Sequence, residues 1–186
     1  MRFFIALEIP NEEKLQFQAI QVKLQTIITQ ARITSHDKLH LTLAFIGEQP
    51  DTLTQPLTEM LDIAAQGISP FTITPAYIDG FPNIHEPHVI WAGVKGDIDK
   101  IIILRERIKD GLNKLNLNID ERRFIPHISI AKLDGNTEIS IETEEKLQSL
   151  MQNTFNPIHI SSIKLFESVP NEGFHKHNTL AEVKLQ

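Results

Sequence analysis

The stretch His40-Leu41-Thr42-Leu43-Ala44 recurs 87 positions later, from 40 to 127, as His127-Ile128-Ser129-Ile130-Ala131. Two further pairs of segments align at the same offset without gaps: 3–7 with 90–94, and 71–74 with 158–161. All six segments are short runs of apolar or alternating apolar and polar residues, which is typical of strands. The chain is therefore predicted to contain two copies of one structural unit.

The residues between these strands predict helices in both copies. Asn11 is expected to cap a helix in the first copy and Asp97 in the second, because short polar side chains accept hydrogen bonds from the free N–H groups of a first helical turn. Apolar residues then recur at helical spacing. The expected helices cover about residues 11–31, 51–65, 97–115 and 142–151, and an extra strand is expected at 179–185.

These elements predict an α+β fold in one domain, residues 1–186. The domain is expected to be bilobal, with approximately residues 1–82 in the first lobe and 83–186 in the second. The join lies near Asp79-Gly80-Phe81-Pro82-Asn83, where Gly and Pro interrupt the pattern. We expect the lobes to be related by a pseudo-two-fold axis, with antiparallel sheets facing a central cleft and the helices outside.

Length and composition exclude several classes of protein. The 186 residues fit one domain, and no apolar run approaches the roughly 20 residues that a membrane-spanning helix needs. With no cysteine, the chain has no disulfide, thiolate metal site or cysteine nucleophile, and a cytoplasmic location is expected. The formal charge of −6 argues against a large basic surface, so a nucleic-acid partner would be contacted at an end or as a short piece. No obligatory protein partner is indicated.

Each copy of the motif carries one imidazole and one hydroxyl two positions apart: His40 with Thr42, and His127 with Ser129. Because side chains alternate along a strand, each histidine shares a face with its hydroxyl, and the aliphatic residues between them face the core. A two-fold relation between the lobes would bring the two polar faces together. The result would be a pocket with two imidazoles and two hydroxyls.

That set of groups suits in-line displacement at phosphorus without a metal ion. One neutral imidazole can take a proton from an attacking water, and the other, as imidazolium, can protonate a leaving ribose oxygen. Both forms exist near neutral pH because the unperturbed pKa of histidine is about 6.5. The hydroxyls can donate to the non-bridging oxygens, where charge develops. On this reasoning alone the roles of His40 and His127 are interchangeable.

The chain resembles the two-histidine phosphoesterases, specifically the bacterial and archaeal RNA 2′,3′-cyclic phosphodiesterases, also called 2′-5′ RNA ligases. The resemblance covers essentially the whole chain. It rests on five segments: Arg2–Leu7, Leu39–Gly47 with the first motif, Gly80–Pro82, Phe124–Lys132 with the second motif, and Ile163–Ser168.

The resemblance implies opening of an RNA 2′,3′-cyclic phosphate to a 2′-phosphomonoester, with no metal and no cofactor. By matching positions, it implies that His40 is the proton donor to the leaving 3′ oxygen and that His127 is the proton acceptor that activates water. Thr42, Ser129 and Lys132 would bind the substrate, an RNA end or a short cyclic-phosphate nucleotide.

The chain departs from the family pattern His-x-Thr-x-x-Arg in its second motif. Ser129 keeps the hydroxyl but lacks the methyl group that stiffens the threonine side chain. Lys132 keeps the positive charge but lacks the bidentate fork of arginine. Lys132 also has the opposite strand parity to His127, so it reaches the cleft only if the strand ends or bulges there. The match to the aromatic residue that the family carries after a late glycine is blurred here, at Gly173-Phe174-His175.

Two histidine clusters outside the motifs admit a second interpretation. His85-Glu86-Pro87-His88 and His175-Lys176-His177 could bind zinc or nickel. Solvated loop histidines are the favoured interpretation, although His177 or Lys176 could lie near the cleft.

Arg122 and Arg123 fit a solvated turn better than a phosphate contact along RNA. Several phenylalanines are core candidates, one of which could stack on a base: Phe45, Phe81, Phe124 and Phe174. Three alternatives to RNA cyclic-phosphate hydrolysis stay open. They are a related phosphodiesterase acting on 2′-5′ linked or small cyclic nucleotides, a non-catalytic RNA-end binder, and a histidine metal protein.

Overall fold

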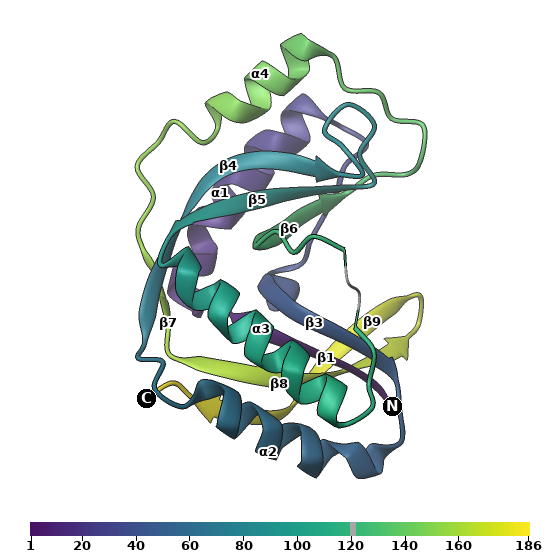
Figure 1. Ribbon diagram of the computed structural model, residues 1–186. Coiled ribbons are helices and arrows are strands. Elements are labelled where there is room, and N and C mark those ends of the chain that lie inside the picture. Colours follow the sequence, from purple (N-terminus) through teal and green to yellow (C-terminus); the bar gives the residue numbers. More distant parts are fainter. Residues whose placement is uncertain (120–121) are drawn as a thin grey trace.

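The computed structural model describes residues 1–119 and 122–186 and confirms the α+β class (Figure 1). The elements in chain order are β1 (Arg2–Glu8), α1 (Asn11–Ile27), β2 (Arg32–Ile33), the 3-10 helix η1 (His36–Lys38), β3 (His40–Glu48), the 3-10 helix η2 (Asp51–Leu53), α2 (Thr54–Ala65), β4 (Phe71–Phe81), β5 (Val89–Gly96), α3 (Ile98–Lys114), β6 (His127–Lys132), α4 (Ile141–Ser149), β7 (Ile158–Ile160), β8 (Ser162–Asn171) and β9 (Phe174–Lys184). Among these residues no helix combines the length and the apolar character needed to cross a membrane.

The repeat in the sequence is a repeat of elements. α1 begins at Asn11 and α3 at Ile98, while α2 begins at Thr54 and α4 at Ile141, so both pairs start 87 positions apart. β1 corresponds in the same way to β5, and β3 to β6. β4 corresponds to β7 and β8 taken together, and β9 is the extra strand.

The two expected sheets are joined into one curled antiparallel sheet with the strand order β7-β4-β5-β6-β3-β1-β8-β9, and β2 pairs with β6 beside this path. The seam between the halves is the pair of motif strands, β3 and β6, which the ladder connects at Leu41 and Ile128. The most important strands for the site thus lie at the centre of the sheet.

The two repeats exchange elements across this seam. β4 precedes residue 82 but pairs with β5, and β8, late in the second repeat, pairs with β1. The helices follow the same exchange. α1 and α4 contact each other on the half that contains β4, β5 and β6, and α2 and α3 contact each other on the half that contains β1 and β3 (Figure 1). Each spatial half therefore contains parts of both repeats.

The helices cover one face of the sheet, and the hydrophobic core lies between the helices and that face. Leu104, Ile108 and Leu112, at helical spacing on α3, are fully buried in a hydrophobic cluster that includes residues of both repeats. Each such side chain contributes about 1.5–3 kcal/mol by leaving water. Phe4, Ala6 and Phe166 form a separate small cluster on the opposite face of the sheet. We call that face the inner face.

The predicted helix caps differ in detail. Pro10, not Asn11, is the residue before α1, and it provides no side-chain cap. Asp97 does precede α3, but its side chain makes no cap bond. Its Oδ2 instead accepts a hydrogen bond from the Thr72 backbone N–H at 3.0 Å, which ties the start of α3 to β4.

The last strand is longer than expected because it pairs with β8 along its whole length, from Asn171 opposite Phe174 onward. The connecting turn consists of Glu172 and Gly173, both with positive φ, 40° and 89°. Two such residues form the tight turn that matches the twist of a hairpin. This turn fixes the register that places His177 on the inner face, opposite Ser168.

Candidate active site

The two motif strands bring their polar residues to one place. β3 and β6 run antiparallel, and Leu41 lies opposite Ile128. Extending this register by one residue in each direction puts His40 and His127 each opposite the hydroxyl residue of the other motif, all on the inner face. Diagonal neighbours in a regular antiparallel pair lie about 7–8 Å apart, which leaves room for a phosphate group between the two rings.

Each histidine is oriented by the backbone two residues before it. His127 Nδ1–H donates to the Ile125 carbonyl at 2.7 Å, so Nε2 of the neutral ring is free to accept a proton. The His40 ring hydrogen-bonds the Lys38 backbone, and His40 Nε2 lies 3.1 Å from Thr42 Oγ1. We assign the Lys38 bond to Nδ1 because Nε2 faces Thr42. In both rings the backbone thus holds Nδ1, which leaves Nε2 as the nitrogen for proton transfer.

Aromatic residues support both rings. The Phe4 ring lies 5.3 Å from that of His40, and the Trp91 ring lies 5.4 Å from that of His127. Phe4 and Trp91 occupy equivalent positions in the repeat, 87 residues apart. Phe81 adds an edge-to-face contact with His127 at 4.9 Å. Such packing restricts the rings to one orientation and removes water from around them.

A β-bulge follows the hydroxyl residue of each motif, at an equivalent position. Trp91 pairs with Ser129 but Ile90 pairs with Ala131, so Ile130 is an extra residue in β6. In β3, Thr42 pairs with Ala6 but Ala44 pairs with Ile5, so Leu43 is the extra residue. An extra residue reverses the alternation of side chains after it.

The bulges explain where the residues after the motifs point. Lys132 lies opposite Val89, which shares its strand face with Trp91, so Lys132 lies on the same face as His127. The bulge therefore allows Lys132 to reach the cleft, although its sequence parity is opposite to that of His127. Phe45 is the equivalent residue of the first motif, pairs with Phe4, and is 68% exposed. The two halves thus differ: one has an exposed aromatic ring where the other has a cation.

A third histidine lies beside the first. The rings of His177 and Phe4 are 4.8 Å apart, and the ring of His177 also contacts that of His40. The sequence favours a solvated loop for His177 and leaves a place near the cleft open, but His177 lies on strand β9. The only sequence signal was its place in a cluster of two histidines near the chain end.

The site lowers the pKa of all three histidines. Burial, together with the nearby His177, Lys14 and His127, lowers the pKa of His40 to about 4, although the Lys38 backbone bond works in the opposite direction. Burial lowers the pKa of His127, against the effect of its bond to Ile125. Burial and Lys38 lower the pKa of His177. Without a ligand, all three imidazoles are therefore neutral at pH 7.

A family model described as the 2′-5′ RNA ligase superfamily matches residues 12–168. The chain belongs to the 2′-5′ RNA ligase superfamily. The resemblance inferred from the motifs is thus confirmed. The matched span contains both motifs and stops before β9, so His177 lies outside it.

The chain is also similar to curated relatives in sequence and to solved structures in fold. An RNA 2′,3′-cyclic phosphodiesterase of Thermotoga maritima is 31% identical over 133 residues, covering 72% of this chain and 70% of the relative. One of Aeropyrum pernix is 26% identical over 148 residues, covering 80% and 82%. The fold is similar to TT0787 of Thermus thermophilus, with a TM-score of 0.79, 20% identity and coverage of 100% and 98%. It is also similar to E. coli LigT complexed with 3′-AMP, with a TM-score of 0.75, 21% identity and coverage of 99% and 97%.

In the two other histidine clusters, His85 and His175 contact neighbouring protein groups. His85 Nδ1 lies 3.2 Å from the Ile139 carbonyl, and its Nε2 lies 3.6 Å from Glu144. His175 Nδ1 lies 3.2 Å from Ser168 Oγ. Within residues 1–119 and 122–186, no group of three or more His, Cys, Asp or Glu side chains is placed to hold a metal ion. Arg122 and Arg123 are both exposed.

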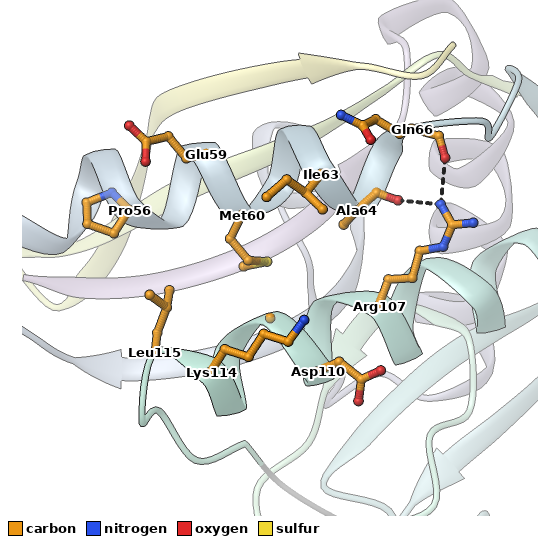
Figure 2. Close-up of a pocket in the computed structure, with 11 residues that line it drawn as sticks. Pro56, Glu59, Met60, Ile63, Ala64, Gln66, Arg107, Asp110, Lys114 and Leu115 are labelled. Atoms are coloured by element: carbon orange, nitrogen blue, oxygen red, sulfur yellow. Dashed lines mark hydrogen bonds between the residues drawn. The ribbon is translucent and has the colours of Figure 1, made fainter.

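The candidate site is distinct from a hollow on the other side of the sheet, which no histidine lines. That hollow, about 610 Å³, lies between α2 and α3 on the outer side (Figure 2). Arg107 spans its end, donating to the carbonyls of Ala64 and Gln66 at 3.1 and 2.6 Å. A second pocket, about 470 Å³, lies at the edge of the inner face and includes Lys132.

Proposed function

We propose that this protein hydrolyses RNA 2′,3′-cyclic phosphodiester ends to 2′-phosphomonoesters by acid–base catalysis, with His40 as proton donor and His127 as proton acceptor. The observation that carries the proposal is the placement of both imidazoles on adjacent strands of one face, each anchored through the backbone two residues before it. The names of the relatives from T. maritima and A. pernix support the substrate class.

The reaction consumes one water and breaks one P–O bond. His127 Nε2 takes a proton from water as its oxygen attacks phosphorus. The bond to the 3′ oxygen breaks on the opposite side, and His40 Nε2–H gives its proton to that oxygen. Each transfer contributes a factor of about 10²–10⁴ in rate. The 2′ oxygen keeps the phosphate, and His40 and His127 exchange protonation states, which solvent then restores.

Three side chains are proposed to bind the phosphate. Thr42 and Ser129 each share a face with the catalytic histidine of their own strand, from which a hydroxyl can donate to a non-bridging oxygen. Lys132, turned to the inner face by the bulge at Ile130, supplies a positive charge. These groups compensate the charge that develops on the phosphoryl oxygens in the transition state.

Substrate binding itself favours the protonated form of His40. The free site is neutral, since burial holds the pKa of His40 at about 4. A bound phosphodiester anion favours the imidazolium and raises that pKa. The substrate therefore binds together with a proton, and a buried imidazolium with a low intrinsic pKa is a strong acid toward the leaving oxygen.

None of these steps requires a metal ion or a cofactor, and we propose a metal-independent reaction. The test is turnover of an RNA oligonucleotide with a 2′,3′-cyclic phosphate end in excess EDTA, with identification of the product. The expected product is the 2′-phosphate. Formation of the 3′-phosphate, or complete loss of activity in EDTA with recovery on adding a metal, would contradict the proposal. Tight binding without turnover would favour the RNA-end binder instead. A cytoplasmic location stays a prediction.

A further inference from the structure

The pocket of about 470 Å³ at the edge of the inner face adjoins the proposed active site. Lys132 belongs to both, because it lines the pocket and shares the sheet face of His127. Lys38 also lines the pocket, and its backbone holds the ring of His40. The pocket is therefore connected to the proposed active site through Lys132 and Lys38.

The pocket is locally basic in a chain whose formal charge is −6. Three of its lining side chains are cations: Arg32, Lys38 and Lys132. Arg32 forms an ion pair with Asp134 at 2.9 Å. Lys38 and Lys132 form no ion pair with any carboxylate in residues 1–119 and 122–186.

One carboxylate shares the pocket with these cations. A hydrogen bond from Ser35 lowers the pKa of Asp37, so Asp37 stays ionised at neutral pH. The two lysines, Lys38 and Lys132, carry two positive charges, one more than the single negative charge of Asp37. The pocket can therefore accept one phosphodiester anion without a proton.

The mouth of the pocket carries an exposed aromatic ring. Phe174, at the start of β9, is 52% exposed and lines the pocket. Lys38 Nζ lies 5.5 Å from the centre of its ring. Proteins that bind single-stranded nucleic acids commonly combine an exposed aromatic ring with cations: a base stacks on the ring, and a phosphate contacts the cation.

We propose that this pocket binds the nucleotide that precedes the cyclic-phosphate end of an RNA chain. The inference rests on the proposed function, because a 2′,3′-cyclic phosphate ends the chain and leaves only the 5′ direction for further nucleotides. The base of that nucleotide stacks on Phe174, and its phosphodiester contacts Lys38, with Lys132 shared between this phosphodiester and the cyclic phosphate. The preferred substrate is then an oligonucleotide of at least two residues.

The test compares kcat/KM for a mononucleotide 2′,3′-cyclic phosphate with that for a dinucleotide carrying the same end. The wild type is expected to prefer the dinucleotide by about tenfold or more, the value of one stacked base. Phe174→Ala should remove most of this preference. Equal kcat/KM for both substrates in the wild type would overturn the inference.

A matched control is available on the outer side of the molecule. Ile63 is 67% exposed in the hollow between α2 and α3, so Ile63→Ala should leave the preference unchanged. A loss of preference in Ile63→Ala equal to that in Phe174→Ala would contradict a specific subsite.

Binding separates this inference from the proposed function. Calorimetry with 3′-phosphorylated mono- and dinucleotides needs no turnover. Tighter binding of the dinucleotide that depends on Phe174 would support the subsite even if the cyclic ends were not hydrolysed. Equal binding of both ligands by wild type and Phe174→Ala would exclude the subsite even if hydrolysis occurs.

Discussion

The imidazole rings of His40 and His177 lie 5.5 Å apart in an edge-to-face arrangement on the inner face of the sheet. Because both can carry a proton, the charge on one disfavours the charge on the other, and His177 lowers the pKa of His40. His177→Asn should therefore raise the pKa of His40 above its value of about 4. Titration of the ring signals by NMR measures this directly.

The control for this prediction is His159→Asn. His159 lies on β7 and is exposed, with its Nδ1 3.1 Å from Glu13 on the outer side. The pKa of His40 should not change in this variant. An unchanged pKa of His40 in His177→Asn would show that the ring contact has no electrostatic effect.

The half-buried imidazole of His40 predicts how stability depends on pH. Its pKa is about 4 in the folded protein against 6.5 in the unfolded chain, so the unfolded chain binds more protons between these values. The free energy of unfolding should fall as the pH falls through that window, by up to about 3 kcal/mol from this residue. Denaturant unfolding at a series of pH values measures it.

His40→Gln should flatten this pH dependence. His127 and His177, whose pKa values are also lowered, act in the same direction, so part of the slope should remain. The same slope in His40→Gln and the wild type would mean that His40 is not the buried titrating group.

The lowered pKa values also predict the pH dependence of the reaction. The active form needs one protonated and one neutral imidazole, and in the free site the pKa values of both His40 and His127 lie below 6.5. Above that pH, kcat/KM should fall by about tenfold per unit as the protonated form disappears. The basic limb of kcat should lie at higher pH, because the bound anion raises the pKa. A flat kcat/KM between pH 6.5 and 8.5 would contradict this scheme.

Lys132 provides a test of the bulge. If the bulge at Ile130 turns Lys132 toward the phosphate, Lys132→Gln should lower kcat/KM by about ten- to a hundredfold, the value of a hydrogen bond to a charged group. Lys132→Arg keeps the charge and should keep most of the activity. Lys23→Gln, at an exposed position on α1, is the control. Wild-type activity in Lys132→Gln would place that side chain outside the site.

The motif repeat was enough to predict much of this architecture. A constant offset between the two motifs predicted the α+β class, the helix positions and the shared face of each histidine with its hydroxyl. It could not predict that β4 and β8 exchange halves, because strand pairing is non-local and nothing within β4 distinguishes β5 from β1 as its partner.

The bulges and His177 show the other limits. Leu43 and Ile130 are ordinary aliphatic residues in alternating runs, so the extra residue is visible only in the pairing of β3 with β1 and of β6 with β5. The position of His177 follows from the register of the β8–β9 hairpin, which has no counterpart in the first repeat. The roles of His40 and His127 as donor and acceptor stay predictions.

The central claim is that both imidazoles act on one phosphorus atom, and comparison of His40→Ala, His127→Ala and the double variant tests it most directly. Groups that act as a unit lose most of their effect when either is removed. With folding verified by circular dichroism, each single variant should lose at least about 10²–10⁴ in kcat on a cyclic-phosphate-ended RNA, and the double variant should be little worse than either. Full activity in either single variant, or losses that multiply in the double variant, would contradict the account.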